Sequence, residues 1–199
     1  MIRPVPRFSW LACGSALLLG LGLLCATGPS PAARSAAPPW AEGPPGGYAD
    51  RFELVGLVDR PRVFTLADLQ RYPAWTLTVA YGTGRGMEVG RFTGVPLWEL
   101  LREAGVQVAP SRHNDRLRKY LVATGSDGYE VVVSLAELDP EFGAAGALVA
   151  YQRDGELLGP TEGMARLVIA SDKRGGRLVS NLVRLEVRDI DSPPRSNSA

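Results

Sequence analysis

Residues 76–105, TLTVAYGTGRGMEVGRFTGVPLWELLREAG, combine two strand patterns with one helix pattern. Bulky and polar residues alternate over residues 75–81, which is typical of a strand with one buried face. A glycine-rich turn at residues 82–86 separates this strand from a returning strand at residues 87–92. Pro96 suits the first position of a helix, and the closing glycine suits the residue that ends it. The stretch therefore predicts a strand, a turn, a second strand and a helix.

The same patterns continue through the rest of the chain. Asp-Gly pairs between strand-like segments predict hairpins around residues 125–128 and 153–155. A Thr or Ser followed three residues later by an acid opens the segments 65–69 and 134–138, and this is the spacing of a helix capping box. Many short strands, several hairpins and three short helices predict an α+β fold with mixed sheets, not alternating β–α–β units.

The N-terminus has a different composition from the rest. Arg3 and Arg7 precede an almost wholly apolar run at residues 11–26, and small residues and prolines follow it. This order predicts a secretory signal peptide over residues 1–35, with the cleavage position left open. A retained membrane anchor and a lipidated Cys25 are the alternatives. An exported protein, periplasmic or otherwise, is the expectation, with membrane contact only through an uncleaved or lipidated leader.

Composition divides the remaining chain into three parts. Residues 36–50 are rich in proline and glycine and predict a flexible tether. Residues 51–190 carry the strand and helix patterns and predict one domain. Residues 191–199 are polar and predict a disordered tail. Together these parts predict a single exported domain.

Charge and cysteine content exclude several classes of function. The chain has 22 basic and 21 acidic residues. Three of the arginines lie in the predicted leader, so the domain is close to neutral and is not expected to bind nucleic acid. The two cysteines, Cys13 and Cys25, also lie in the leader. The domain therefore offers no disulfide, no thiolate metal ligand and no cysteine nucleophile.

Two segments are candidates for binding an anion. The glycines of residues 82–86 could let backbone amides approach a phosphate, but their spacing matches neither a dinucleotide nor a Walker motif, so a hairpin turn is the alternative. Arg166, Lys173, Arg174 and Arg177 bracket a strand end, where clustered cations could clamp a phosphate or carboxylate. A solvated turn is the alternative for this second segment.

Other polar residues have simpler interpretations. His113 is the sole histidine and is expected to be solvated in a loop. Asp127 suits the turn of its hairpin. Asp139 and Glu141 are expected to be surface charges beside a short helix.

From residue 52 to residue 187, the order of motifs resembles the sulfite-oxidase-like, molybdopterin-binding oxidoreductase domain. No single motif is specific, but their order and spacing together carry the resemblance. The motifs are Gly56-Leu57-Val58 with Arg60-Pro61, TLADLQRYP at residues 65–73, FTGVPL at residues 92–97, SDGY at residues 126–129, Asp154-Gly155, Arg166-Leu167-Val168, and Arg177 with residues 182–187.

The resemblance implies a mixed α+β fold and, in catalytic members, a molybdenum–pterin cofactor whose metal is held by one cysteine thiolate. That cysteine would fall near Ala80, at the end of a strand, and the sequence has none there. Arg166 falls on a motif position that implies an anion contact. Arg85, Arg91 and Lys173 are added as candidate anion contacts from their charge and neighbourhood. No catalytic or metal-ligating residue is expected.

Two classes of function follow from these residues. One is a non-catalytic exported domain that binds a small anionic ligand or a periplasmic protein partner in the former cofactor cleft. The other is a periplasmic oxidoreductase that holds a molybdenum–pterin without a cysteine ligand. The missing cysteine favours the first. Whether any cofactor is bound stays open at this point.

Overall fold

The computed structural model describes residues 46–192, which belong to one compact unit, Ala37–Ala199. The predicted signal peptide, most of the predicted tether and the end of the predicted tail lie outside the described residues. In the part that is described, none of the helices has the length and apolar character needed to cross a membrane.

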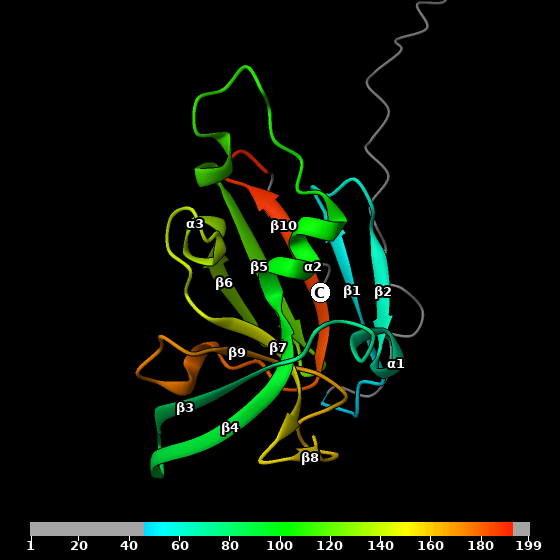
Figure 1. Ribbon diagram of the computed structural model, residues 1–199, viewed down its shortest axis with the longest axis vertical. Helices are drawn as coiled ribbons and strands as arrows, with labels where there is room; N and C mark the ends of the chain where they lie inside the picture. Colours follow the sequence, from blue (N-terminus) through cyan, green and yellow to red (C-terminus); the bar gives the residue numbers. More distant parts are fainter. Residues whose placement is uncertain (1–45, 193–199) are drawn as a thin grey trace, which may run out of the picture. The chain divides into compact units, whose positions relative to one another are not determined.

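Short strands dominate the described chain, as expected for an α+β fold (Figure 1). The elements are β1 Arg51–Gly56, β2 Arg62–Thr65, α1 Leu66–Leu69, β3 Trp75–Thr83, β4 Gly86–Pro96, α2 Leu97–Ala104, a 3-10 turn at Asp115–Arg118, β5 Lys119–Gly125, β6 Glu130–Ser134, α3 Leu135–Leu138, β7 Ala147–Arg153, β8 Glu156–Leu157, β9 Arg166–Ile169, a 3-10 turn at Gly175–Arg177, and β10 Leu182–Asp189.

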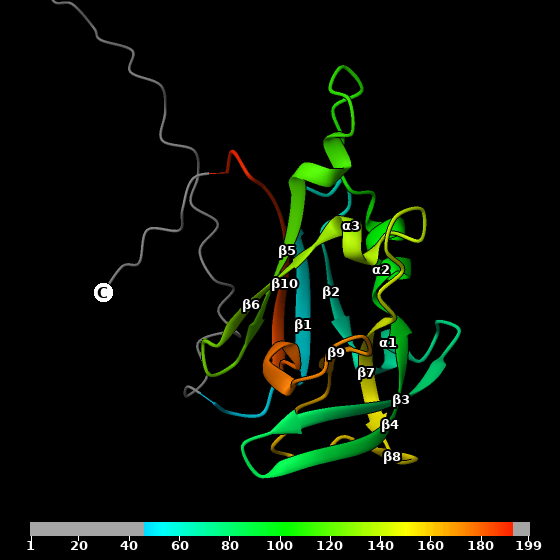
Figure 2. The same cartoon turned by 90° about the vertical axis from the view of Figure 1, so that its left-hand side faces the viewer.

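The strands form two five-stranded sheets. The first has the order β2-β1-β10-β5-β6, with β1 and β10 parallel and the other neighbours antiparallel. The second has the order β3-β4-β7-β8, and β9 also pairs with β7. In both views, β3 and β4 project as a two-stranded ribbon at one end of the domain (Figures 1 and 2).

The helix ends follow from local sequence. The Thr65 side chain accepts a hydrogen bond from the backbone N–H of Asp68, and the Asp68 carboxylate accepts one from the N–H of Thr65, so the predicted capping box is confirmed. Gly105 ends α2 in the left-handed region, with φ of 73°. Pro96 is not the first helical residue as expected. It still pairs with Leu148 in the sheet, so the helix begins one residue later.

Both predicted Asp-Gly hairpins are confirmed. Asp154 and Gly155 have φ of 54° and 95°, which is the backbone twist that two-residue hairpins favour. The Asp127 carboxylate accepts a hydrogen bond from the N–H of Tyr129 at 2.9 Å, so Asp127 acts as a turn residue.

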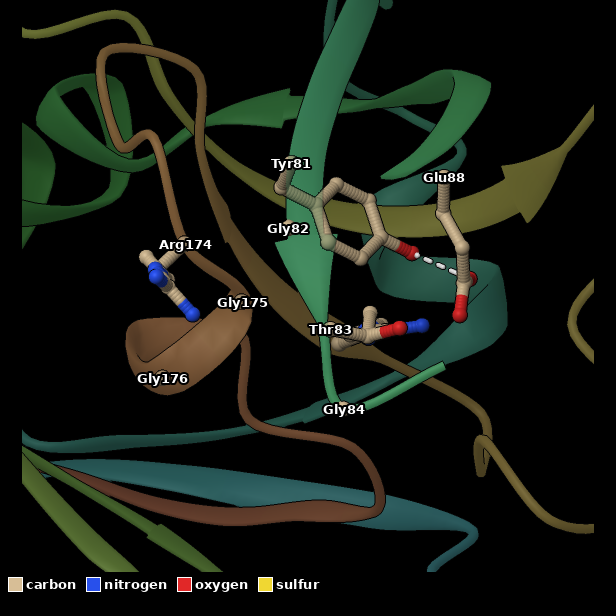
Figure 3. A pocket seen from close by; sticks show the side chains of 9 residues that line it. Tyr81, Gly82, Thr83, Gly84, Glu88, Arg174, Gly175 and Gly176 are labelled. Carbon is tan, nitrogen blue, oxygen red and sulfur yellow. Dashed lines mark hydrogen bonds between the residues drawn. The ribbon is translucent and has the colours of Figure 1, made fainter. Parts of the chain in front are cut away.

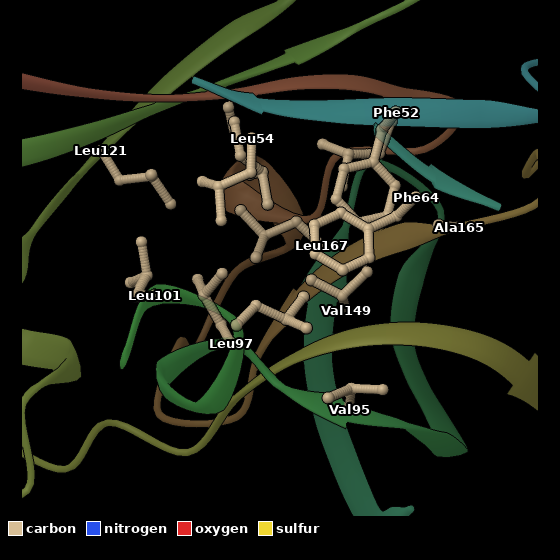
Figure 4. Close-up of a cluster of buried hydrophobic side chains, with 14 of the residues drawn as sticks. Phe52, Leu54, Phe64, Val95, Leu97, Leu101, Leu121, Val149, Ala165 and Leu167 are labelled. Atoms are coloured by element: carbon tan, nitrogen blue, oxygen red, sulfur yellow. The ribbon is translucent and has the colours of Figure 1, made fainter. Parts of the chain in front are cut away.

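Strands β7 and β9 are buried on both faces, and this organises the interior. Along them, Val149 and Leu167 belong to the main core, together with α2 and the first sheet (Figure 4). The alternate residues Leu148 and Val168 belong to a second cluster, beneath the β3–β4 ribbon. Successive side chains on a strand point to opposite faces, so the second sheet curls until its ribbon covers β7 and β9.

The curl depends on a close backbone approach at Gly94. The register between β4 and β7 shifts between Thr93 and Gly94, as at a β-bulge. A Cβ atom on Gly94 would lie 2.2 Å from the carbonyl oxygen of Val149 and 2.5 Å from the Cα of Ala150. Only a glycine fits between these two strands. This explains, in this chain, the glycine of the FTGVPL segment.

One surface assignment from the sequence is wrong. Asp139 is buried, with its side chain 1% exposed, because Arg116 donates to its Oδ2 at 2.6 Å and the N–H of Glu141 donates to its Oδ1 at 2.9 Å. Glu141 itself is exposed, as expected.

The last residues of the predicted tether contact the domain. The N–H of Gly46 donates to the carbonyl of Ser126, and the Ser126 hydroxyl donates to the carbonyl of Gly47. The N–H of Ala49 donates to the buried side chain of Asn181 at 3.2 Å. These contacts fix where the chain enters β1.

Replacing Gly94 with alanine tests the close approach. We expect Gly94→Ala to lower the free energy of unfolding by about 1–3 kcal/mol, since a methyl group would force β4 and β7 apart. The measurement is urea denaturation followed by circular dichroism. Gly84→Ala is the matched control, because no atom lies within 4 Å of the added Cβ at Gly84. Equal stability of the two variants would contradict the packing described at Gly94.

Candidate functional site

A pocket of about 480 Å³ lies between the end of the β3–β4 ribbon and the loop after β9 (Figure 3). The ribbon contributes an aromatic ring, a hydroxyl group, a carboxylate and two glycines. The loop contributes a guanidinium and two glycines, and β9 adds a second guanidinium. The lining residues are Tyr81, Gly82, Thr83, Gly84, Glu88, Arg166, Arg174, Gly175 and Gly176.

Backbone contacts hold the two sides of the pocket together. The N–H of Gly82 donates to the carbonyl of Lys173 at 2.9 Å, and Gly82 forms a parallel bridge with Arg174. Gly175 lies against the Tyr81 ring, where an added Cβ would be 3.0 Å from the ring edge. The loop is also held from the first sheet, because the Tyr129 hydroxyl donates to the carbonyl of Gly176 at 2.6 Å.

Tyr81 and Glu88 form the acidic side of the pocket. The Tyr81 hydroxyl donates to Glu88 Oε2 at 3.1 Å, and an Arg153 nitrogen lies 3.5 Å from the same oxygen. Burial raises the pKa of the Tyr81 phenol, and the charges of Arg166 and Arg153 oppose that shift. The hydrogen bond from Tyr81 lowers the pKa of Glu88. At neutral pH this side therefore presents a neutral phenol and an ionised carboxylate.

Arg166 is held in place on the inner face of the ribbon. Its Nη1 donates to Glu162, and its guanidinium carbon lies 5.7 Å from the centre of the Phe92 ring. Arg153 lies 5.5 Å from the same ring and 3.7 Å from the same Glu162 carboxylate, which offsets the two positive charges. The Nε of Arg166 is buried and has no hydrogen-bond partner in residues 46–192. A buried donor of this kind calls for an acceptor.

Arg174 is a positively charged residue of the pocket whose guanidinium has no partner in the described part of the chain. Residues 46–192 show no ion pair or hydrogen bond to its guanidinium, which Figure 3 places across Tyr81 from Glu88. Arg177, three residues on, is different. It donates to Asp172 at 2.9 and 2.6 Å and to Glu137 at 2.9 Å, so it braces the loop.

The four predicted anion contacts do not converge. Arg166 lines the pocket, whereas Arg85, Arg91 and Lys173 are exposed and do not line it. Arg85 lies in the turn of the ribbon, and Arg91 pairs with Thr78 on the outer face of the ribbon. Lys173 contributes only its backbone carbonyl, to Gly82.

Sequence reasoning singled out residues 82–86, of which Gly82, Thr83 and Gly84 line the pocket, but it did not bring Tyr81 and Glu88 into the site. The alternation of residues 75–81 placed Tyr81 on the inner face, but no local pattern showed that the loop after β9 would lie against it. His113 is exposed, as expected for a solvated loop residue.

The position that the resemblance assigns to a metal-ligating cysteine lies outside the pocket. Ala80 is exposed and pairs with exposed Val89 on the outer face, while its neighbour Tyr81 points inward. Residues 46–192 contain no cysteine, and they contain no group of three His, Cys, Asp or Glu side chains that could hold a metal ion. These residues do not fit a molybdenum ion held by a protein thiolate.

Several known proteins are similar to this chain in sequence. Nitrate reductase [NADPH] of Phytophthora infestans is 30% identical over 172 residues, which is 71% of this chain and 18% of that protein. Nitrate reductase [NADH] 1 of Arabidopsis thaliana is 28% identical over 168 residues, 70% of this chain and 18% of that protein. The chain thus spans about a fifth of the length of these relatives.

A solved structure agrees with the sequence matches. The sulfane dehydrogenase SoxCD of Paracoccus pantotrophus is 27% identical and matches with a TM-score of 0.58, covering 76% of this chain and 41% of that chain. The expected sulfite-oxidase-like α+β fold is therefore confirmed. The model of the oxidoreductase molybdopterin binding domain matches residues 48–195. The chain belongs to the oxidoreductase molybdopterin binding domain family.

Proposed function

We propose that this chain is a non-catalytic member of its family, which binds a small anionic ligand in the pocket between the β3–β4 ribbon and the loop after β9. The observation that carries the proposal is the guanidinium of Arg174, which has no partner within residues 46–192 and lines a pocket of about 480 Å³. Because the sequence predicts a signal peptide, we propose that this binding takes place after export, in the periplasm.

Three features support an anionic ligand. Arg174 offers donors to oxygen atoms of a phosphate or carboxylate, and the guanidinium of Arg166 adds a second positive charge to the pocket lining. Gly175 and Gly176 let a ligand approach the backbone closely, since they carry no side chain. Glu88 stays ionised and would repel an anion at the other end of the pocket, which favours a ligand whose charge is concentrated at one end.

The absence of a thiolate supports a non-catalytic role. In the described chain, the position near Ala80 carries a methyl group on the outer face and no sulfur ligand. The alternative is an oxidoreductase that holds a molybdenum–pterin through other contacts. Its support is family membership and the similarity to nitrate reductases and SoxCD.

Metal content separates these two functions. We expect the protein purified from cells supplied with molybdate to contain molybdenum far below one atom per chain, because the domain offers no thiolate. The measurement is inductively coupled plasma mass spectrometry, with pterin fluorescence after denaturation as an independent readout. Stoichiometric molybdenum, or released pterin, would contradict the non-catalytic role.

Replacing Arg174 tests the anion site. We expect the parent chain to bind glycerol 3-phosphate, and Arg174→Ala to weaken that binding at least about tenfold, as loss of a charge-assisted hydrogen bond does. Isothermal titration calorimetry measures the dissociation constant. Arg91→Ala is the matched control, since it removes an exposed arginine from the opposite face of the ribbon.

Two results would count against the pocket as the anion site. One is an equal loss of affinity in Arg174→Ala and Arg91→Ala, because a diffuse positive potential would then account for binding. The other is an absence of binding to glycerol 3-phosphate and inorganic phosphate by the parent chain.

A further inference from the structure

Strand β3 is an open sheet edge of an unusual kind. It has nine residues, WTLTVAYGT, and none of them is charged. The other strands at the ends of the two sheets are shorter and charged: β2 has four residues with Arg62, β6 has five with Glu130, and β8 has two with Glu156. Short length and charge protect sheet edges from pairing with another chain. Strand β3 lacks both protections.

The direction of the unpaired backbone groups follows from one hydrogen bond. Residues in an antiparallel ladder alternate between bonding the partner strand and pointing away from it. The N–H of Gly82 points away from β4, because it donates to Lys173. Thr76, Thr78 and Ala80 therefore also direct their N–H and C=O groups to the open side. In the described chain, the backbone hydrogen bond on that side is the one that Gly82 donates to Lys173.

The side chains along this edge are small and neutral. Thr76, Thr78 and Ala80 are exposed on the outer face of the ribbon. Next to them on β4, Met87 and Val89 are 70% and 63% exposed, which is much apolar surface for a ribbon of this size. Backbone groups without partners and apolar side chains thus lie together on the ribbon.

We propose that β3 pairs with β3 of a second copy of this chain, antiparallel and about a twofold axis at Thr78. The axis places Thr78 opposite itself and Thr76 opposite Ala80 of the second copy. The open N–H and C=O groups of these residues then satisfy one another in about six hydrogen bonds. At a twofold axis, a residue lies next to the same residue of the second copy.

Self-pairing depends on the neutrality of this edge. A charged side chain at the axis would meet an identical charge, and like charges directly opposite destabilise a strand pair. Threonine at the axis meets a second threonine, a pair that can share a hydrogen bond. The edge strands β2 and β6 are shorter than β3, and each carries a charged residue, Arg62 or Glu130, so they are less suited to pairing of this kind. The occupant that fits β3 is therefore another β3. This pairing does not depend on the proposed ligand.

The pairing is tested by measuring the molecular mass in solution of the protein that is recovered after expression of the full chain. Sedimentation equilibrium is expected to show a dimer for the parent chain and for Thr78→Val, which keeps shape and neutrality. Thr78→Lys is expected to raise the dimer dissociation constant at least about tenfold, since it places two positive charges at the axis. Circular dichroism checks that each variant is folded.

A cysteine at the axis gives a second readout. Paired residues at a hydrogen-bonded site have Cα atoms about 5.5 Å apart, within the range of roughly 4.4–6.8 Å that a disulfide spans. Thr78→Cys is expected to form a reducible dimer on mild oxidation, beyond any background that the parent protein shows under the same conditions. Val132→Cys, exposed on the edge strand β6, is the control and is expected to stay at that background.

Three results would overturn the proposal: a monomeric parent chain at about 100 μM, where even weak specific dimers form; a dimer that Thr78→Lys leaves intact; or cross-linking of Thr78→Cys that is no faster than that of Val132→Cys. A monomer that still binds glycerol 3-phosphate would remove the dimer and leave the proposed function in place.

Discussion

The backbone contact between Gly94 and Val149 is the constraint on which the rest of the structure depends. It lets β4 pass so close to β7 that no side chain fits between them. The register shift beside it bends the sheet, as a bulge does. Because of this bend, the β3–β4 ribbon folds over β7 and β9 and gives them a second buried face. Val79, Tyr81 and Phe92 fill the space beneath it. Without that layer the loop after β9 would have no strand edge to meet, and the pocket would have one wall.

The ribbon therefore has two faces with different chemistry. The inner face carries Tyr81 and Glu88 into a polar pocket, where the arginine of β9 and the arginine of the following loop meet them. The outer face carries Ala80, Val89 and Met87, which are exposed. The family resemblance places the metal-ligating cysteine near Ala80, and Ala80 itself carries a methyl group on the outer face. The chain shares the fold of its family, while residues 46–192 contain no cysteine. The proposed binding role rests on this combination of a shared fold and a position near Ala80 without a thiolate.

Much of the fold could be predicted because its signals are local. The capping box at Thr65, the helix end at Gly105 and the two Asp-Gly hairpins each depend on residues within a few positions of one another. The site could be predicted only in part. Its walls are joined by a hydrogen bond between residues 82 and 173, and no local pattern reports a contact across that separation. Asp139 shows the same limit, since its burial depends on Arg116, more than twenty positions away.

The separation of position 80 from the pocket is tested most directly by the reactivity of a thiol placed there. Ala80→Cys and Val79→Cys form a matched pair, because Val79 is its inward-facing neighbour and is 1% exposed. Maleimide labelling of the folded chain, corrected for the parent chain, measures the exposure of each thiol. We expect a thiol at position 80 to react as fast in the folded chain as in urea, with or without glycerol 3-phosphate. The thiol at position 79 should react only after unfolding. A thiol at position 80 that is protected in the folded chain, or that becomes protected when glycerol 3-phosphate binds, would contradict the placement of position 80 outside the pocket.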